Sequence, residues 1–318
     1  MWTHYLIQSI IYCVHRSGLI LALALALPAL TGCSRGLDDG SPSAVGIESQ
    51  YADVISQVAG PRVRVRAILT DPNTDPHEFE ASPAIARRIA SASLVIENGL
   101  GYDPWVDRIL AASPGPRTVI NVQRLLGLPA AANPHVWYDP RTMPAVAAAV
   151  AAALATREPA RAADFRARAR AFDASLAPWR EALEALKRRY RGVAVAVTEP
   201  VANDMLEAAG CAILTPYALQ MAVMNGTDPA PQDVAAQEAL LTGHRVKVLI
   251  YNRQVTDPLT ASFVELARRN GIPVVGVYET MPAGYHYQSW MLAEVTALEQ
   301  ALAHGISTTR LARGGARP

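Results

Sequence analysis

One stretch in the middle of the chain, residues 159–191, has the sequence PARAADFRARARAFDASLAPWREALEALKRRYR. Its large apolar residues recur at steps of seven, four, three, four, three and four, as on the core-facing side of an amphipathic helix: Phe165, Phe172, Leu176, Trp179, Leu183, Leu186 and Tyr190. Pro159 suits the first turn of a helix, and Gly192 follows the last apolar position. About 30 helical residues would extend roughly 45 Å, which is longer than one small domain requires. We therefore predict one long helix that joins two parts of the chain.

On both sides of this helix, short apolar runs typical of strands alternate with helical segments. We predict an α/β fold of two lobes, each a mostly parallel sheet flanked by helices, joined by one long rigid helix. The predicted boundaries are 44–157 for the N-terminal lobe, 158–192 for the linking helix, 193–306 for the C-terminal lobe and 307–318 for a disordered tail. Two helices with a break near Pro178 are the alternative to one long helix.

Length and charge narrow the classes of function. The 318 residues leave room for two domains of ordinary size with a sizeable core. A net charge of +1 gives no strong electrostatic attraction for polyanions, so we expect no nucleic-acid partner. Acidic residues are interspersed among the arginines of residues 159–191, which favours a solvated helix face.

The N-terminus has the pattern of an export signal. Arg16 precedes an apolar run over residues 19–30, which is too short to span a bilayer comfortably but suits a signal peptide. The run ends in Leu-Thr-Gly-Cys, which resembles the lipobox at which bacterial lipoproteins are cleaved and lipidated on the cysteine. We therefore predict a lipoprotein signal over residues 1–33 with lipidation at Cys33, and a polar tether over residues 34–43. An ordinary secretory signal with an incidental cysteine is the alternative.

Four side chains are candidates for a functional site. His77 lies in the loop segment DPHEFE just past a predicted strand, and His135 lies in the segment NPHVWYDP. Glu199 and Glu279 each follow directly on a run of buried strand residues. In open α/β sheets, ligands bind at the carboxyl ends of the strands. Taken singly, each histidine could be a surface-loop residue, and each carboxylate could cap the next helix.

Taken together, these two imidazoles and two carboxylates, two from each lobe, are a suitable set of ligands for a divalent metal ion. Mixed nitrogen and oxygen donors suit Mn(II), Fe(II) or Zn(II). Two carboxylates would neutralise the charge of the ion. Asp257 is an alternative to Glu279 as the fourth ligand.

The segments around these residues resemble those of a known family, the zinc- and manganese-binding receptors of bacterial metal ABC transporters. DPHEFE is similar to the family segment DPH-x-(Y/F)-E, NPHVWYDP to the segment of the second histidine, and NGLGYDPWVDRIL (residues 98–110) to a strand end followed by a tryptophan-containing helix. VTEP has Glu199 at the third ligand position, which is histidine in zinc types and glutamate in manganese types. VYETMP has Glu279 at the fourth position, where the family usually has aspartate. The resemblance covers roughly residues 44–304.

This resemblance implies a lipid-anchored receptor on the periplasmic or extracytoplasmic face of the membrane, monomeric and not an enzyme. It would bind one divalent ion, Zn or Mn with Fe as a third candidate, between its lobes through His77, His135, Glu199 and Glu279. It would deliver the ion to an ABC permease.

The chain also departs from the family pattern. It lacks a histidine-rich loop between residues 98 and 133, and it has Tyr-Asn-Arg-Gln at residues 251–254, where relatives often have Val-Glu-Pro. A metal-dependent hydrolase is one alternative, although no HExxH, GxSxG or P-loop motif is present. A metal-binding adhesin or chaperone without a permease is another.

Overall fold

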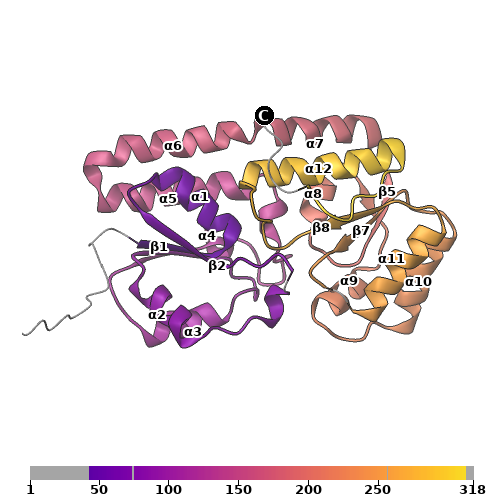
Figure 1. Ribbon diagram of the computed structural model, residues 1–318, viewed down its shortest axis with the longest axis horizontal. Helices are drawn as coiled ribbons and strands as arrows, with labels where there is room; N and C mark the ends of the chain where they lie inside the picture. The colour runs from indigo at the N-terminus through magenta and orange to yellow at the C-terminus, as the bar shows by residue number, and fades with distance from the viewer. Residues whose placement is uncertain (1–42, 74, 256, 313–318) are drawn as a thin grey trace, which may run out of the picture. The chain divides into compact units, whose positions relative to one another are not determined.

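Two parallel β-sheets, one in each lobe, form the framework of the protein (Figure 1). We analysed a computed structural model that describes residues 43–312 apart from 74 and 256. The N-terminal lobe contains β1 (Ser43–Glu48), α1 (Ser49–Ala59), β2 (Arg64–Leu69), the 3-10 helix η1 (Pro76–Glu78), α2 (Pro83–Ser91), β3 (Leu94–Glu97), α3 (Trp105–Ala112), β4 (Thr118–Asn121), α4 (Val122–Leu126), the 3-10 helix η2 (Val136–Tyr138) and α5 (Thr142–Arg157).

A linking segment and a second lobe follow. The linking segment contains the 3-10 helix η3 (Pro159–Arg161), α6 (Ala162–Ser175) and α7 (Ala177–Tyr190). The C-terminal lobe contains β5 (Ala194–Val197), α8 (Asn203–Ala208), β6 (Ala212–Ile213), α9 (Tyr217–Met224), α10 (Pro231–Thr242), β7 (Leu249–Asn252), α11 (Pro258–Arg269), β8 (Val274–Val277) and α12 (Tyr287–His304).

The two sheets have the same topology. Their strand orders are β2-β1-β3-β4 and β6-β5-β7-β8, and all the pairings are parallel. Strands β3 and β8 are buried along their whole length, and only Glu97 at the end of β3 is not apolar, because helices cover both faces of a parallel sheet. The prediction of two α/β lobes is therefore confirmed. In such sheets the strand order reverses next to the first strand of each unit, and the carboxyl ends on either side of that point border a crevice.

The predicted long helix is present and has one interruption. It consists of α6 and α7 in direct succession, with Leu176 between them at φ −82° and ψ −5°, so the chain keeps its helical course there. Pro178 has no N–H to donate to the preceding turn, which explains the interruption. Figure 1 shows α6 above α5 and α1, and α7 beside α12. The helix thereby packs on both lobes.

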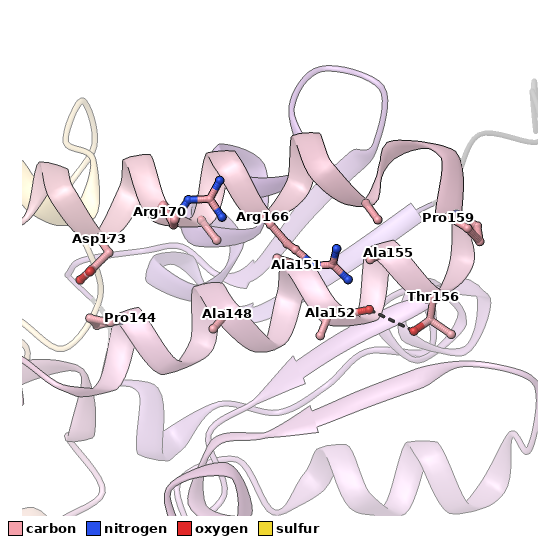
Figure 2. Close-up of a pocket in the computed structure, with 12 residues that line it drawn as sticks. Pro144, Ala148, Ala151, Ala152, Ala155, Thr156, Pro159, Arg166, Arg170 and Asp173 are labelled. Atoms are coloured by element: carbon pink, nitrogen blue, oxygen red, sulfur yellow. Dashed lines mark hydrogen bonds between the residues drawn. The ribbon is translucent and has the colours of Figure 1, made fainter.

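The apolar stripe of the linking helix is buried as predicted. Six of its seven residues are at most 3% exposed, namely Phe165, Phe172, Leu176, Trp179, Leu183 and Leu186. Helices α6 and α5 border a groove of about 630 Å³, and half of the residues that line it are alanine (Figure 2). None of the four predicted ligands lines this groove.

The prediction of a disordered tail from residue 307 is wrong for residues 307–310. Thr308 forms a parallel bridge with Val275 of β8. Its N–H donates to the carbonyl of Val274 at 2.9 Å, and its own carbonyl accepts from Gly276 at 2.8 Å. The exposed edge of β8 offers unpaired backbone groups, which this segment satisfies. The sequence did not predict the two-residue strand β6 or helix α9 either.

Candidate metal centre

His77 is positioned by a capped turn in the loop that follows β2. Asp75 is extended and its carboxylate accepts a hydrogen bond from the backbone N–H of His77 at 2.8 Å, while Pro76 fills the first position of η1. The Asp-Pro-His sequence therefore builds a short rigid turn without help from distant residues. It holds an imidazole of which 22% remains exposed.

His135 is fully buried, and its ring orientation is set by Asn133. The side-chain carbonyl of Asn133 accepts from the backbone N–H of His135 at 3.1 Å and lies 2.9 Å from its Nδ1. The amide nitrogen of Asn133 donates to the carbonyl of Pro200 at 2.9 Å, which fixes the orientation of the amide group. Nδ1 must then carry the proton, so Nε2 is left with a lone pair to donate to a metal.

Glu279 reaches this histidine pair from the C-terminal lobe. It follows β8 and is 1% exposed. Its backbone N–H donates to the side-chain carbonyl of Gln254 at 2.7 Å, and its own carbonyl accepts from the side chain of Gln50 in α1 at 3.3 Å. The second bond joins the two lobes next to the cluster.

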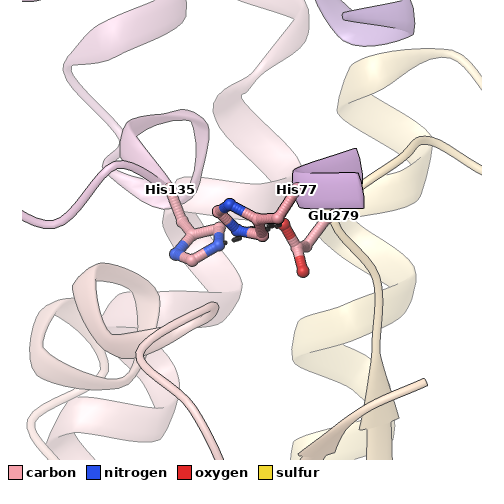
Figure 3. Close-up of side chains that lie close together, drawn as sticks. All are labelled: His77, His135 and Glu279. Carbon is pink, nitrogen blue, oxygen red and sulfur yellow. Dashed lines mark hydrogen bonds and ion pairs between the residues drawn. The ribbon is translucent and has the colours of Figure 1, made fainter. Parts of the chain in front are cut away.

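The three side chains converge on one carboxylate oxygen (Figure 3). Oε2 of Glu279 lies 3.2 Å from Nε2 of His135 and 3.4 Å from Nε2 of His77. The three candidate donor atoms lie within 4.8 Å of one another. In a tetrahedral site with metal–ligand bonds of about 2.0–2.1 Å, neighbouring donor atoms are about 3.3–3.4 Å apart. The two nitrogen–oxygen separations are therefore close to those that a metal ion would require.

The local electrostatics keep Glu279 ionised and shift the pKa values of the two histidines in opposite directions. Burial alone would raise the pKa of Glu279, but the two adjacent imidazoles outweigh burial and hold that pKa below its ordinary value. Burial opposes a charge on His77, yet the adjacent carboxylate of Glu279, 3.4 Å from its Nε2, raises the pKa of His77 overall. Complete burial lowers the pKa of His135, which Glu279 offsets only in part. His135 is therefore the histidine that is neutral over the wider pH range.

Glu199, the fourth predicted ligand, lies beside the cluster but is not one of the three side chains that converge. It follows β5, is 3% exposed, and its Oε2 accepts weakly from the side-chain amide of Asn252 at 3.4 Å. Its Oε1 has no hydrogen-bond partner within the described part of the chain. Burial and the nearby charge of Glu279 raise the pKa of Glu199 well above its ordinary value. A buried, unsatisfied carboxyl oxygen of this kind calls for a cation or a proton.

Asp257, the alternative fourth ligand, has another structural role. Its carboxylate caps α11 by accepting from the backbone N–H groups of Leu259 and Thr260 at 2.7 and 3.0 Å. His286 is likewise a helix cap, at the start of α12, and its Nδ1 lies 2.7 Å from the carboxylate of Asp53.

Several residues around the cluster were not identified as functional from the sequence. The hydroxyl of Tyr102 donates to Oε2 of Glu279 at 2.9 Å, and its ring lies edge-on to His77 at 4.9 Å. Trp137 packs edge-on against His135 at 5.4 Å and forms a wall of the site. Asn252 lies in the segment that departs from the family pattern, and this departure was the only sequence signal for it.

Two parallel-sheet lobes with imidazole and carboxylate donors gathered between them define a class of two-lobed binding proteins. This chain belongs to the family described as zinc-uptake complex component A, periplasmic, whose family model matches residues 48–301. The family is one of uptake components and not of enzymes, as predicted.

Individual relatives match shorter segments. The zinc-binding protein TroA of Treponema pallidum is 28% identical over 183 residues, which are 54% of this chain and 58% of that protein. The manganese-binding lipoprotein MntA of Bacillus subtilis is 30% identical over 138 residues, which are 39% of this chain and 44% of that protein. The chain thus matches about half the length of these relatives.

Solved structures support the fold over a longer range. The structure of the SBP FpvC from Pseudomonas aeruginosa in complex with Mn2+ has a TM-score of 0.68 to this chain. The superposition covers 83% of this chain and 99% of that chain, at 20% sequence identity. At this identity the likeness establishes the shared two-lobed fold alone.

The predicted lipidation site, Cys33, and the signal segment lie outside the described residues. Among the residues that the structure does describe, none of the helices combines the length and the apolar character needed to cross a membrane.

Proposed function

We propose that this protein captures one divalent transition-metal ion, Zn or Mn with Fe as a third candidate, through His77, His135, Glu199 and Glu279. The observation that carries the proposal is the convergence of Nε2 of both histidines on Oε2 of Glu279, at 3.4 and 3.2 Å. Two imidazoles from one lobe and two carboxylates from the other give a buried shell whose charge balances that of the ion.

The proposal extends to delivery and anchoring. Membership of a family described as a component of a zinc-uptake complex supports a membrane permease of the ABC type as the partner. The lipoprotein name of the Bacillus subtilis relative supports a lipid anchor, which in this chain would be attached at Cys33 on the extracytoplasmic side of the membrane.

A hydrolase needs an open coordination position for water or substrate, and four protein ligands would leave none. Capture and release of an ion therefore fit these residues better than catalysis. The donors come from two lobes, so release requires the separation of Glu279 from the histidines, by relative movement of the lobes or of side chains.

Elemental analysis of the purified protein tests the proposed site directly. We expect close to one Zn, Mn or Fe ion per chain in the parent and none in a His77→Ala/Glu199→Ala double variant, because each change removes one donor. A His244→Ala/Glu238→Ala double variant is the matched control, since both of these residues are exposed. Equal metal content in the parent and in the site variant would contradict the proposed ligands.

Metal affinity should fall as the pH is lowered, because imidazole binds a metal only when it is deprotonated. Glu279 raises the pKa of His77, so the decrease should begin above the ordinary histidine value of about 6.5. Competition titrations at several pH values would measure this. His77→Ala should flatten the dependence and the exposed His244→Ala should not. An affinity that stays constant from about pH 5 to 7.5 would exclude a shell with two histidines.

A further inference from the structure

The side chain of Asn252, at the end of β7, lies between the two candidate carboxylates. Its Nδ2 lies 2.5 Å from Oε1 of Glu279 and 3.4 Å from Oε2 of Glu199. Its Oδ1 accepts from the backbone N–H of Gln254 at 2.9 Å. That bond fixes the orientation of the amide, so the NH2 group faces the two glutamates.

One amide group therefore occupies one oxygen of each carboxylate. For Glu279 the other oxygen is Oε2, which faces both imidazoles. For Glu199 the other oxygen is Oε1, which is buried and has no hydrogen-bond partner within residues 43–312 as described. Oε2 of Glu279 also accepts a hydrogen bond from the hydroxyl of Tyr102 at 2.9 Å and keeps a second lone pair. Asn252 thus leaves each glutamate with one oxygen to offer to a cation, and the two histidines add one nitrogen each.

We propose that Asn252 limits both glutamates to a single donor oxygen and so restricts the metal shell to four protein donors. Such a shell suits an ion that accepts tetrahedral coordination, above all Zn2+. It disfavours Mn2+, which takes more oxygen ligands in octahedral sites and would gain from two-oxygen coordination by a carboxylate. This inference rests on the proposed function, and it makes Asn252 a residue that determines metal specificity.

The separations within the cluster agree with this assignment. The distances of 3.2 and 3.4 Å between Oε2 of Glu279 and the imidazole nitrogens are close to the edge of a tetrahedron with bonds of about 2.0–2.1 Å. An octahedral site with bonds of about 2.2 Å would place neighbouring donors about 3.1 Å apart, which is equally close to the shorter separation, so the assignment rests on the hydrogen bonds of Asn252 and not on these distances. By resemblance alone, glutamate at position 199 would indicate manganese, so Asn252 reverses the expected preference.

The test compares Zn2+ and Mn2+ affinities of the purified parent and of Asn252→Ala by competition titration. Removal of the amide frees a second oxygen on both glutamates, so we expect the ratio of Zn2+ to Mn2+ affinity to fall by about tenfold or more. Co2+ supplies an independent readout. The parent should give the intense visible absorption of four-coordinate cobalt, and the variant the weaker bands of a higher coordination number.

Two further variants make the outcome unambiguous. Asn252→Ser, whose hydroxyl hydrogen can hold only one carboxylate oxygen at a time, should change the ratio in the same direction. Asn225→Ala removes an exposed amide and should change neither readout. If the parent binds metal but the ratio and the cobalt spectrum stay the same in both position-252 variants, the role of Asn252 is refuted and the site stands. If the parent binds none of Zn2+, Mn2+ and Co2+, the proposed function fails and this inference fails with it.

Discussion

Replacing Glu279 by glutamine should lower the affinity for a divalent ion by more than about a hundredfold, beyond the effect of changing residues that only support a ligand. Oε2 of Glu279 lies within 3.4 Å of both imidazole nitrogens, so it supplies the charge at the centre of the cluster. Glutamine has the same shape, but its amide is a weaker donor to a metal ion and brings no negative charge to balance it. A competition titration against a chromophoric chelator would measure the loss.

The matched control for this change is Glu238→Gln, which alters an exposed glutamate in α10 and should leave metal affinity unchanged. The ion-free variant should also show a cooperative unfolding transition, which separates a loss of binding from a loss of fold. Parent-like affinity in a folded Glu279→Gln variant would mean that the ion binds elsewhere. Asp257 would be an unsuitable substitute because its carboxylate caps α11.

Replacing Glu294 by glutamine should stabilise the protein at pH 8 and have little effect near pH 4.5. Glu294 is fully buried in α12, and its Oε1 accepts from the indole N–H of Trp290 at 2.8 Å. Its Oε2 has no hydrogen-bond partner among the described residues. Burial raises the pKa of this carboxyl from its ordinary value of 4.5 to about 8.

The direction of this effect follows from proton binding. Between pH 4.5 and about 8 the folded state holds a proton on Glu294 that the unfolded state has lost, so parent stability falls as the pH rises through this window. The difference corresponds to on the order of 5 kcal/mol once the pH exceeds the folded pKa. Glutamine cannot ionise, so the variant should escape that loss. Denaturant unfolding of parent and variant at both pH values would measure it, with Glu238→Gln as the control.

An identical pH dependence of unfolding in the parent and in Glu294→Gln would contradict this account of Glu294.

The result also matters for the metal site. The hydroxyl of Tyr138 lies 3.4 Å from Oε1 of Glu294 and donates at 2.8 Å to the carbonyl of Tyr278, the residue before Glu279. Glu294 therefore supports a contact between the lobes next to a candidate ligand.

Local sequence patterns were enough to predict much of the fold. The stripe from Phe165 to Leu186 predicted a long helix with a buried face because side-chain periodicity is a local property. Apolar runs ending at polar residues predicted the strands and their carboxyl ends for the same reason. His77, Glu199 and Glu279 follow such strand ends directly or after a short loop, so topology alone predicted that they would lie at the crevice between the lobes.

Local patterns could not predict which of these groups meet. Asn252 and Glu279 are 27 positions apart, and Tyr102 and Glu279 are 177 positions apart, yet both pairs are hydrogen-bonded. Pairings of this kind depend on how the lobes pack, which no window of neighbouring residues encodes. Glu294 illustrates the same limit, since nothing beside it in the sequence shows that it is fully buried.

The sequence by itself determined the two α/β lobes, the helix that joins them and the histidines and glutamates placed at strand ends, because periodicity, turn chemistry and parallel topology act locally. Only the tertiary structure decided that His77, His135 and Glu279 converge on one oxygen and that Glu199 lies beside them across Asn252. The physical reason is that donor geometry and burial arise only where segments from both lobes pack together. These contacts determine whether each carboxylate is ionised and which of its oxygens faces a possible ion.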